Sequence, residues 1–346
     1  MQALQVVRHG RPSEALEVRD IDIPEPGPGQ VRVQVGAASV NRSDIDGCYG
    51  RARSVNPDLP YTLGMDCCGV VDAAGPGAET WVGKRVMTIA AGAIGGMAEY
   101  ALGMASSTFD VPDALDDAEG AAFMLTFHTT HLALHRRAGL RAGETLLVHS
   151  GAGSLGSAAV QLGVAAGARV LATARGPEKV KLCEELGATG IDHTREDFVD
   201  RVFELTDGRG ADVVCDLVGG EFTERSWRAT AREGRYIAAG FAGDPGNGHT
   251  GHALRPVSTG NITVIGVLLS WTPELPPEVR KLGFNPFGPE VGQEVHADLL
   301  RLLSEKKIRP IVGQRLPLAE IPAAIEAHEA NTTMGRTVAI FDRAAR

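Results

Sequence analysis

The 346-residue sequence has few cysteines and no surplus of positive charge. Its five cysteines form no C-x-x-C pair, and an odd number does not suit a framework of disulfides. They indicate reduced, mostly buried thiols in a cytosolic protein. The net charge of −9 argues against a nucleic-acid-binding protein, because phosphate contacts need a clustered positive surface.

Long hydrophobic runs are absent as well. No stretch reaches about 18 uninterrupted apolar residues, the length that a membrane-spanning helix needs. Residues 1–10 lack the apolar core of a secretion signal. We therefore expect a cytoplasmic protein with no membrane partner. At 346 residues the chain exceeds the size at which a single core stops growing, so two domains are expected.

Glycine, in contrast, is abundant. The 43 glycines make up about one residue in eight, against about 7% in an average protein. Three of them follow the pattern G-x-G-x-x-G within residues 151–156. An apolar run at 145–149 predicts a buried strand before this pattern, helical spacing predicts a helix over 155–167, and residues 168–174 predict a second strand. This context is typical of a dinucleotide-binding loop rather than of a tight turn without a ligand.

The spacing of these glycines has a physical reason. Gly151 allows the tight turn, Gly153 lets backbone N–H groups approach a pyrophosphate, and Gly156 lets the helix pack closely on the strand. The phosphates would rest on the positive N-terminus of that helix. We expect the intervening residues of the loop to contact the cofactor too: Ala152, Ser154 and Leu155.

The end of the second predicted strand indicates which dinucleotide binds. An NAD site usually carries Asp or Glu there to accept hydrogen bonds from the ribose 2′-OH, whereas this chain has Thr173, Ala174 and Arg175. A guanidinium pairs with a 2′-phosphate that a carboxylate would repel. We therefore predict NADP(H), with Arg175 and Lys179 as the phosphate partners and Thr173 beside the cofactor. The alternative for Lys179 is a solvated helix lysine.

The chain contains two kinds of sequence. Residues 1–120 hold short alternating runs, such as VRVQV at 31–35, and predict a β-rich, partly barrel-like domain. Residues 121–269 alternate strands with helices, which predicts an α/β domain with a doubly wound parallel sheet. Residues 270–346 are too short for a third domain, so we expect them to return to the first and make it discontinuous.

Several individual elements can be placed. Residues 116–140 predict a helix, with acids at its start and basic residues near its end, and a break before Thr129 indicates a kink. The later predicted helices cover 178–186, 198–205, 222–231, 296–305 and 318–329. The later predicted strands cover 212–217, 234–240, 261–269 and 337–341.

Seven stretches together carry a family resemblance: SVNRSDI (39–45), LGMDCCGVV (63–71), GGMAEYAL (95–102), TTHLAL (129–134), SGAGSLGSAAVQLG (150–163), CDLVGG (215–220) and IRPIVGQRLPLAEIPAAIEAHE (308–329). They resemble the medium-chain dehydrogenase/reductase superfamily, specifically its zinc-free, zeta-crystallin-like branch of NADPH:quinone oxidoreductases. The likeness covers nearly the whole chain. It implies a Rossmann domain that binds NADP(H) and a GroES-like catalytic domain.

The resemblance also bears on metal binding. Zinc-dependent relatives place two cysteines and a histidine at positions that hold Asn41, Met65 and Leu125 in this chain. A catalytic zinc needs three nitrogen, sulfur or oxygen ligands and an open position, and this trio offers at most one weak oxygen. The loop of four cysteines that binds structural zinc is missing too. The resemblance therefore implies catalysis without a metal.

By resemblance, Asn41 and Thr129 line the nicotinamide pocket, where an amide and a hydroxyl orient the ring or the substrate carbonyl. The alternative for Asn41 is a turn-forming asparagine. Thr126 is a weaker candidate, since a helix threonine often bonds its own backbone. Relatives that bind NADP(H) often carry a tyrosine where this chain has His193, which either touches the 2′-phosphate or is an ordinary surface histidine. We also expect cofactor contacts where two later strands end, from Val218, Gly219, Gly240 and Phe241.

Some enoyl-reducing relatives use a tyrosine in the loop after the asparagine as a proton donor. Tyr49 and Tyr61 are the candidates here, and both are also explained as packing aromatics. The proton donor therefore stays open between a tyrosine and water. We expect the substrate pocket to be lined by the irregular segments 41–61 and 270–292.

The resemblance implies a zinc-independent, NADPH-dependent oxidoreductase that passes hydride to a small molecule, either a quinone or an α,β-unsaturated carbonyl or enoyl compound. One alternative is alcohol oxidation, which the missing zinc ligands disfavour. Another is an NADPH-binding protein without turnover. Members of this branch commonly pair through an edge strand of the nucleotide-binding sheet, and the apolar run 261–269 suits such a strand, so we expect a homodimer.

Overall fold

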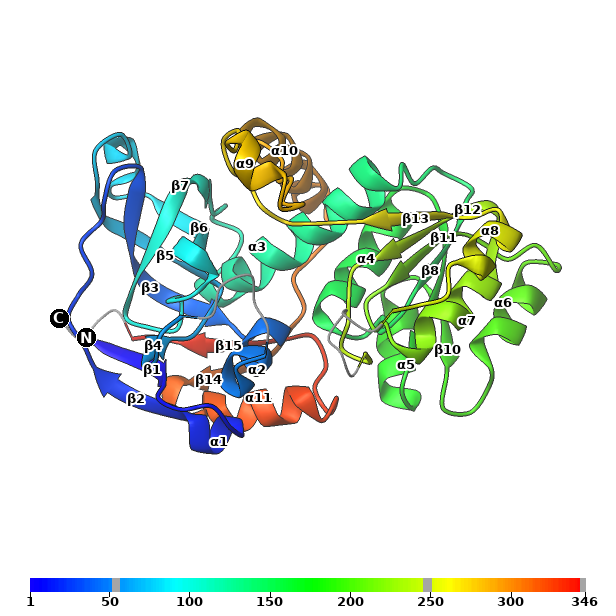
Figure 1. Ribbon diagram of the computed structural model, residues 1–346, viewed down its shortest axis with the longest axis horizontal. Coiled ribbons are helices and arrows are strands. Elements are labelled where there is room, and N and C mark those ends of the chain that lie inside the picture. Colours follow the sequence, from blue (N-terminus) through cyan, green and yellow to red (C-terminus); the bar gives the residue numbers. More distant parts are fainter. Residues whose placement is uncertain (52–56, 245–250, 343–346) are drawn as a thin grey trace. The chain divides into compact units, whose positions relative to one another are not determined.

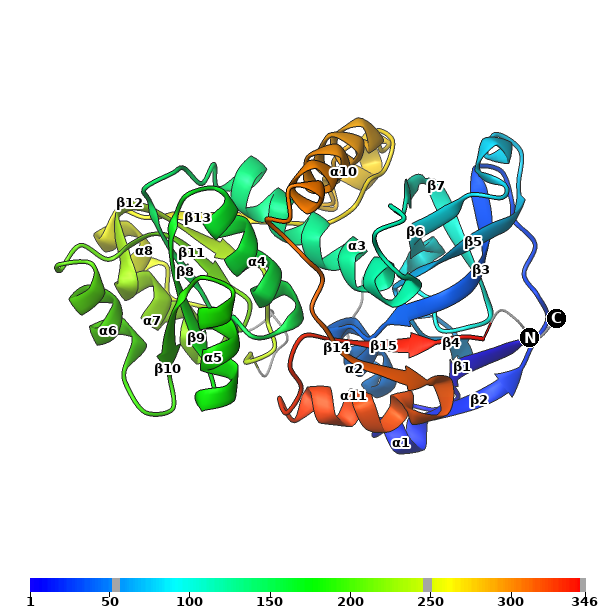
Figure 2. The same cartoon turned by 180° about the vertical axis from the view of Figure 1, so that it is seen from behind.

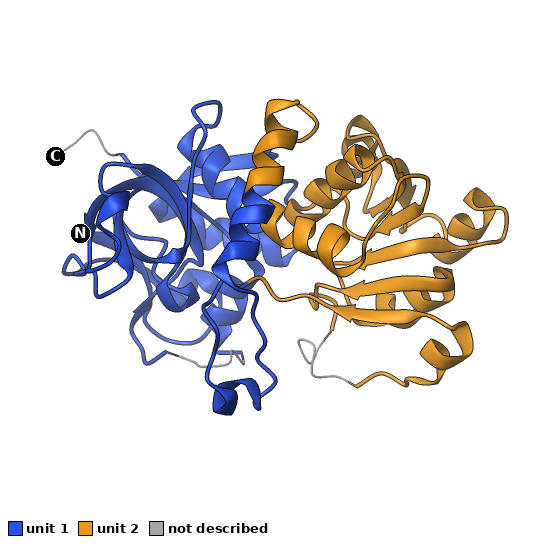
Figure 3. Cartoon of the chain, turned by 90° about the horizontal axis from the view of Figure 1, so that it is seen from above, with its two compact units in different colours: residues 1–125, 270–296, 310–346 blue, residues 126–269, 297–309 orange. Residues whose placement is uncertain are grey.

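The computed structural model describes residues 1–51, 57–244 and 251–342 (Figure 1). They form two compact units (Figure 3). Unit 1 comprises residues 1–125, 270–296 and 310–346, and unit 2 comprises residues 126–269 and 297–309. Unit 1 is thus assembled from three separate stretches of chain, while the short stretch 297–309 joins unit 2.

Unit 2 is built on a six-stranded parallel sheet. Its strands, from one edge to the other, are β10 (Thr189–Asp192), β9 (Arg169–Ala174), β8 (Thr145–Val148), β11 (Ala211–Asp216), β12 (Thr230–Ala238) and β13 (Thr263–Gly266). In order of their appearance in the unit this is 3-2-1-4-5-6, the order of a dinucleotide-binding sheet. The predicted doubly wound α/β fold is confirmed.

Helices cover both faces of this sheet, as Figures 1 and 2 show. They are α4 (Ser154–Ala165), α5 (Pro177–Glu185), α6 (Phe198–Leu205), α7 (Glu221–Ala229) and α8 (Arg255–Gly260). A buried cluster that includes Leu147, Leu171, Val214 and Phe198 packs between the central strands and one helical layer. Parallel strands buried on both faces explain why these strands read as short continuous apolar runs.

Helix α3 (Asp117–His131) is continuous through Thr129, so the predicted kink before Thr129 is wrong. The irregularity lies one turn later, where residues 132–137 form a π-helical turn. There the N–H of Ala138 bonds the carbonyl of Ala133 at 3.0 Å, five residues back, which widens the helix. The sequence pattern cannot distinguish this wider turn from a break.

Unit 1 contains a second six-stranded sheet in the order β14 (Val312–Pro317), β15 (Arg336–Ile340), β3 (Gln30–Ser39), β5 (Asp66–Ala74), β6 (Arg85–Ala90) and β7 (Tyr100–Asp110). Strand β7 pairs with both β6 and β3, which closes four strands into a barrel. Along β3, Val31, Val33 and Val35 are buried and alternate with half-buried polar residues, as predicted. The partly barrel-like domain is confirmed.

Smaller elements complete unit 1. A three-stranded sheet pairs β2 (Leu16–Asp20), β1 (Gln2–Val6) and β4 (Tyr61–Thr62). The helices are α1 (Pro12–Ala15), α2 (Arg42–Tyr49), α9 (Pro277–Arg280) and α11 (Ile321–Glu329), and α10 (Pro289–Ser304) runs from unit 1 into unit 2. All five cysteines are buried, and none forms a disulfide. Within the described ranges, no helix is both long enough and apolar enough to cross a membrane.

Candidate active site

The glycine loop joins β8 to α4 in unit 2 and is shaped by close packing. A Cβ on Gly156 would collide with the carbonyl oxygen of Ser150, and a Cβ on Gly151 would lie 2.8 Å from both Ala172 Cβ and Cys183 Sγ. Ser150 itself has a left-handed backbone with φ of 57°. Two of the three glycines are therefore required by the turn and by helix packing, as the spacing predicts.

Gly153 has a different environment. A Cβ there would meet only atoms of Ser150, at 3.0 and 3.1 Å, so no other element crowds this point of the loop. Gly153 is also the N-cap of α4, and no side chain caps the helix. The first N–H groups of the twelve-residue helix α4 thus lie beside an uncrowded glycine, which is the geometry that accepts a pyrophosphate.

Thr126 contacts this loop directly. Its hydroxyl lies 3.0 Å from the hydroxyl of Ser154, the first residue of α4, and Thr126 is buried. The helix threonine that bonds its own backbone is instead Thr130, which donates to the carbonyl of Thr126 at 2.8 Å. Thr129 lies between them on α3 and is half-buried. Thr126 therefore has a stronger structural link to the loop than the sequence indicates.

The structure brings Arg175, Lys179 and His193 together at the carboxyl ends of β9 and β10. The backbone N–H of His193 donates to the carbonyl of Ala174 at 3.2 Å, beside the exposed Arg175. Burial, and then the charge of Arg175, lower the pKa of both Lys179 and His193. Mutually unfavourable positive groups of this kind are what a dianionic 2′-phosphate would stabilise.

An acid, Asp192, ends β10 directly before His193. One carboxylate oxygen of Asp192 accepts hydrogen bonds from the N–H of Gly176 at 3.2 Å and from the hydroxyl of Thr194 at 2.6 Å. Those bonds lower the pKa of Asp192 and hold it against the backbone. Asp192 therefore shapes the loop after β9.

Thr173 is fully buried, and its hydroxyl lies 2.9 Å from Nδ1 of His149. Nε2 of His149 lies 2.8 Å from the hydroxyl of Ser226 on α7. The carbonyl of Thr173 accepts the N–H of Gly151 at 2.9 Å. The structure thus places the side chain of Thr173 inside the unit, against His149. The backbone carbonyl of Thr173 holds the glycine loop through Gly151.

The loops after β11 and β12 lie against each other. The buried Asp216 accepts the N–H groups of Val218 and Gly219 at 2.8 and 2.9 Å, and the hydroxyl of Tyr236 at 2.6 Å. A Cβ on Gly219 would lie 2.7 Å from the carbonyl oxygen of Gly240. Beside them Phe241 is 45% exposed, an apolar ring at the edge where ligands of such sheets bind.

In unit 1, Asn41 is the N-cap of α2 and is only 4% exposed. Its N–H donates to Asp44 at 2.6 Å, while its amide donates to Asp66 Oδ1 at 2.7 Å and accepts from Arg336 Nη2 at 2.5 Å. The residue therefore caps a helix, and its side chain also belongs to a buried polar network. Sequence reasoning missed Arg336, although an arginine that opens an apolar strand was a usable signal.

The two tyrosine candidates both have protein partners. The hydroxyl of the buried Tyr61 donates to the carbonyl of Gly47 at 3.0 Å. Tyr49 donates to Glu329 at 3.0 Å, and burial and that carboxylate raise its pKa. Residues 52–56 of the predicted pocket segment 41–61 lie outside the described residues.

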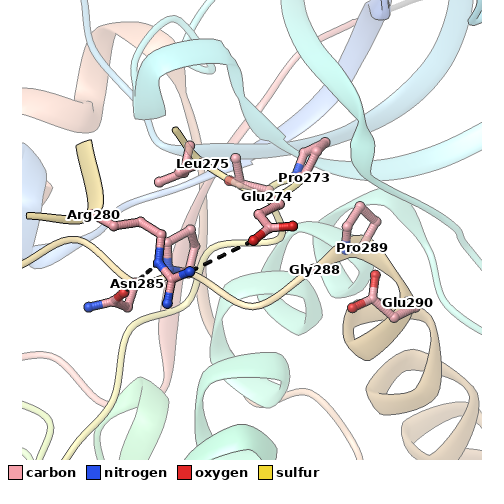
Figure 4. Close-up of a pocket in the computed structure, with 10 residues that line it drawn as sticks. Pro273, Glu274, Leu275, Arg280, Asn285, Gly288, Pro289 and Glu290 are labelled. Atoms are coloured by element: carbon pink, nitrogen blue, oxygen red, sulfur yellow. Dashed lines mark hydrogen bonds and ion pairs between the residues drawn. The ribbon is translucent and has the colours of Figure 1, made fainter. Parts of the chain in front are cut away.

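The other predicted pocket segment, 270–292, forms a polar pocket in unit 1 (Figure 4). Arg280 extends across it, donating to Asn285 at 3.2 Å and lying 3.7 Å from the carboxylate of Glu274. Trp271 anchors the segment, since it is 1% exposed and packs over Gly292, where a Cβ would lie 2.9 Å from its ring. Among the described residues, no three His, Cys, Asp or Glu side chains are grouped to hold a metal.

The model of the alcohol dehydrogenase GroES-like domain matches residues 27–113, and that of the zinc-binding dehydrogenases matches residues 154–282. A quinone oxidoreductase of Pseudomonas aeruginosa is 34% identical over 337 residues, which cover 97% of this chain and 98% of that protein. The chain belongs to the quinone oxidoreductase branch of the medium-chain dehydrogenase/reductase superfamily.

Two solved structures share the fold of this chain over nearly its full length. A mycobacterial protein solved with NADPH has a TM-score of 0.85 and 29% identity, covering 99% of this chain and all (100%) of that one. A quinone oxidoreductase of Pseudomonas syringae has a TM-score of 0.85 and 28% identity, covering 98% of this chain and 99% of that one. One matched family is described as zinc-binding, but its model matches residues 154–282, a range that does not include Asn41, Met65 or Leu125.

Proposed function

We propose that this oxidoreductase transfers hydride from NADPH to a quinone or to an α,β-unsaturated carbonyl compound without a metal ion. The observation that carries the proposal is the pair of Arg175 and Lys179 in unit 2, with His193 beside them, because the two cations supply positive charge where an NAD site would carry an acid. The likeness to a protein solved with NADPH and to named quinone oxidoreductases supports it.

The residues present fit a dinucleotide phosphate. The uncapped N-terminus of α4 and the uncrowded Gly153 would hold the pyrophosphate, and Thr126 would steady Ser154 at that point. Arg175 and Lys179 would hold the 2′-phosphate in charge-assisted hydrogen bonds. When bound, NADPH supplies the hydride, and the protein contributes orientation and exclusion of water.

Asn41 and Thr129 are proposed to orient the nicotinamide or the substrate. Neither side chain ionises, so both act by hydrogen bonding alone. We assign the proton that completes the reduction to water, since Tyr61 donates to the Gly47 carbonyl and Tyr49 donates to Glu329. The reaction then needs no group in unit 1 with a pKa near neutrality.

The test is NADPH consumption by the purified protein with a panel of quinones, 2-alkenals and enoyl thioesters, alongside saturated alcohols with NADP⁺. We expect oxidation of NADPH with at least one conjugated acceptor. We expect no reduction of NADP⁺ with any of the alcohols. A protein that NADPH stabilises against heat, but that oxidises none of it with any acceptor, would be a binding protein and would defeat the proposal.

A further inference from the structure

The side chain of His149 lies in the interior of unit 2, directly before the glycine loop. His149 follows the last residue of β8, and His149, Thr173 and Ser226 are all fully buried. Its Nδ1 lies 2.9 Å from the hydroxyl of Thr173 on β9, and its Nε2 lies 2.8 Å from the hydroxyl of Ser226 on α7. The ring thus joins three elements of the unit, and water does not compete for either bond.

These contacts suit a neutral imidazole. A neutral ring has one N–H group that donates and one nitrogen that accepts, and each of the two hydroxyls can take either role. Burial lowers the pKa of His149 to about 4, so the ring carries no charge near neutral pH. The rings of Phe198 and Phe222 pack against it at steep angles, with centroids 4.8 and 5.1 Å away. The imidazole is therefore held in one place by both polar and apolar neighbours.

The bond to Thr173 begins where the backbone pairing of β8 with β9 ends. The parallel ladder of the two strands runs up to the pair of Val148 and Ala172. Beyond that pair, the side chains of His149 and Thr173 contact each other, and the N–H of Gly151 donates to the carbonyl of Thr173 at 2.9 Å. These two links extend the connection between the strands toward the loops that follow them.

Each of these loops is assigned one phosphate of the cofactor. The glycine loop after β8 would hold the pyrophosphate, and Arg175, two residues after Thr173, would hold the 2′-phosphate. In NADPH both groups belong to the same adenosine ribose, so the distance between them is limited. A ligand that bridges two sites gains from the second site only when the spacing of the sites matches its own length.

We propose that His149 is a positioning residue for the cofactor, because its bond to Thr173 holds the glycine loop at the distance from Arg175 that the two phosphate groups of NADPH require. The bond to Ser226 is assigned to the stability of the unit alone. The inference rests on the phosphate sites of the proposed function, but it does not depend on hydride transfer.

Two fragments of the cofactor test the spacing by isothermal titration calorimetry. 2′-AMP reaches the 2′-phosphate site alone, whereas 2′,5′-ADP reaches the glycine loop as well. Thr173→Val removes the hydroxyl but keeps the shape of the side chain and the carbonyl that binds Gly151. We expect the Kd of 2′,5′-ADP to rise about ten-fold in this variant, while that of 2′-AMP changes less than about two-fold.

Ser226→Ala is the matched control, because it removes the bond at the other nitrogen of the same ring. We expect a fall in melting temperature similar to that of Thr173→Val, with both Kd values within about two-fold of those of the wild type. Thr173→Ser restores a hydroxyl on β9, and it should bring the Kd of 2′,5′-ADP back to within about three-fold of the wild type.

His149→Asn and His149→Leu test the same bond without a change on β9. Asparagine carries a polar atom at the position of Nδ1 but none at the position of Nε2, and leucine carries neither. We expect 2′,5′-ADP to bind about ten-fold more tightly to His149→Asn than to His149→Leu. This pair decides the question if Thr173→Val does not fold.

Equal losses for both ligands in Thr173→Val, or no loss for either, would overturn the proposal. A Ser226→Ala variant that loses 2′,5′-ADP binding to the same extent would overturn it as well. So would a wild type that binds 2′,5′-ADP no more tightly than 2′-AMP, because the two sites would then not be bridged. If the wild type binds 2′,5′-ADP as expected but reduces no acceptor, the proposed function fails, while the Kd values still test the role of His149.

Discussion

At the scale of single residues, we expect cofactor choice to depend most on Arg175. Arg175→Asp removes a charge-assisted contact with the 2′-phosphate and adds repulsion, which costs about 2 to 4 kcal/mol. We expect the ratio of kcat/KM for NADPH to that for NADH to fall below one in this variant. The matched control is Arg169→Asp, since Arg169 is exposed at the opposite end of the same strand. Equal efficiency of the wild type with both cofactors would contradict the prediction.

Two neighbouring threonines of α3 are predicted to differ in role. The hydroxyl of Thr130 is bonded to the helix backbone, whereas Thr129 is the proposed pocket residue. We expect Thr129→Val to lower turnover by about ten-fold with an unchanged melting temperature, because it removes an orienting contact but keeps the shape. Thr130→Val should lower the melting temperature and leave turnover unchanged. The reverse pattern would contradict the assignment and indicate that Thr130, not Thr129, faces the pocket.

At the scale of elements, β13 is an edge strand. It is the last strand of the unit 2 sheet, and Val264 on it is 45% exposed. We expect pairing of two copies along this strand, because an exposed apolar edge promotes association. Val264→Lys should then shift the protein from dimer to monomer in sedimentation velocity. Val164→Lys is the control, since Val164 is a similarly exposed valine (41%) on α4. A wild type that is only monomeric at micromolar concentration would rule the pairing out.

Local patterns were sufficient for most elements of unit 2. The helix predicted over 198–205 has the same bounds as α6, because its apolar residues recur at helical spacing and Asp197 caps it. The short strand β10 was not predicted, since its four residues TGID carry only one fully buried side chain. The π-helical turn at 132–137 was read as a kink three residues too early. Such details depend on packing, which a local pattern does not contain.

The residues of the candidate site also fall into two groups, those that local sequence predicts and those that it does not. The glycine loop and Arg175 lie within one βαβ unit, so their spacing along the chain was enough to predict them. The network around Asn41 was missed, because Arg336 and Asn41 are 295 residues apart and meet only when β15 pairs beside β3. Contacts of that separation leave no local signal in a single sequence.

At the scale of the whole molecule, buried histidines make stability depend on pH. Burial lowers the pKa of His149 and of His296 to about 4, against about 6.5 in an unfolded chain. Below pH 6.5 the unfolded chain takes up protons that the folded chain does not. Stability should therefore fall with decreasing pH between about 6.5 and 4, by about 1.4 kcal/mol per pH unit for each histidine.

Urea midpoints at pH 7.5, 6.5 and 5.5 measure this dependence. His149→Gln keeps hydrogen-bonding groups near Thr173 and Ser226 without a titrating ring, so its midpoints should change less with pH than those of the wild type. Identical pH dependence in both proteins would exclude His149 as a contributor.

Metal independence is also a property of the whole molecule. Because Asn41, Met65 and Leu125 replace the expected ligand set, we expect activity to survive exhaustive chelation, and elemental analysis to find well under one zinc per chain. A zinc-dependent alcohol dehydrogenase treated in parallel should lose its activity. Stoichiometric, tightly held zinc would defeat this expectation.

The late position of β15 in the chain has a consequence for how the protein is made. Strand β15 completes the environment of Asn41, yet it is translated almost 300 residues after that asparagine. At about 5 to 20 residues per second, a ribosome needs roughly 15 to 60 s to cover that distance. Both stretches of unit 2, residues 126–269 and 297–309, are translated in the interval. Unit 2, which holds the glycine loop, can therefore begin to fold before the hydrogen bond between Arg336 and Asn41 can form.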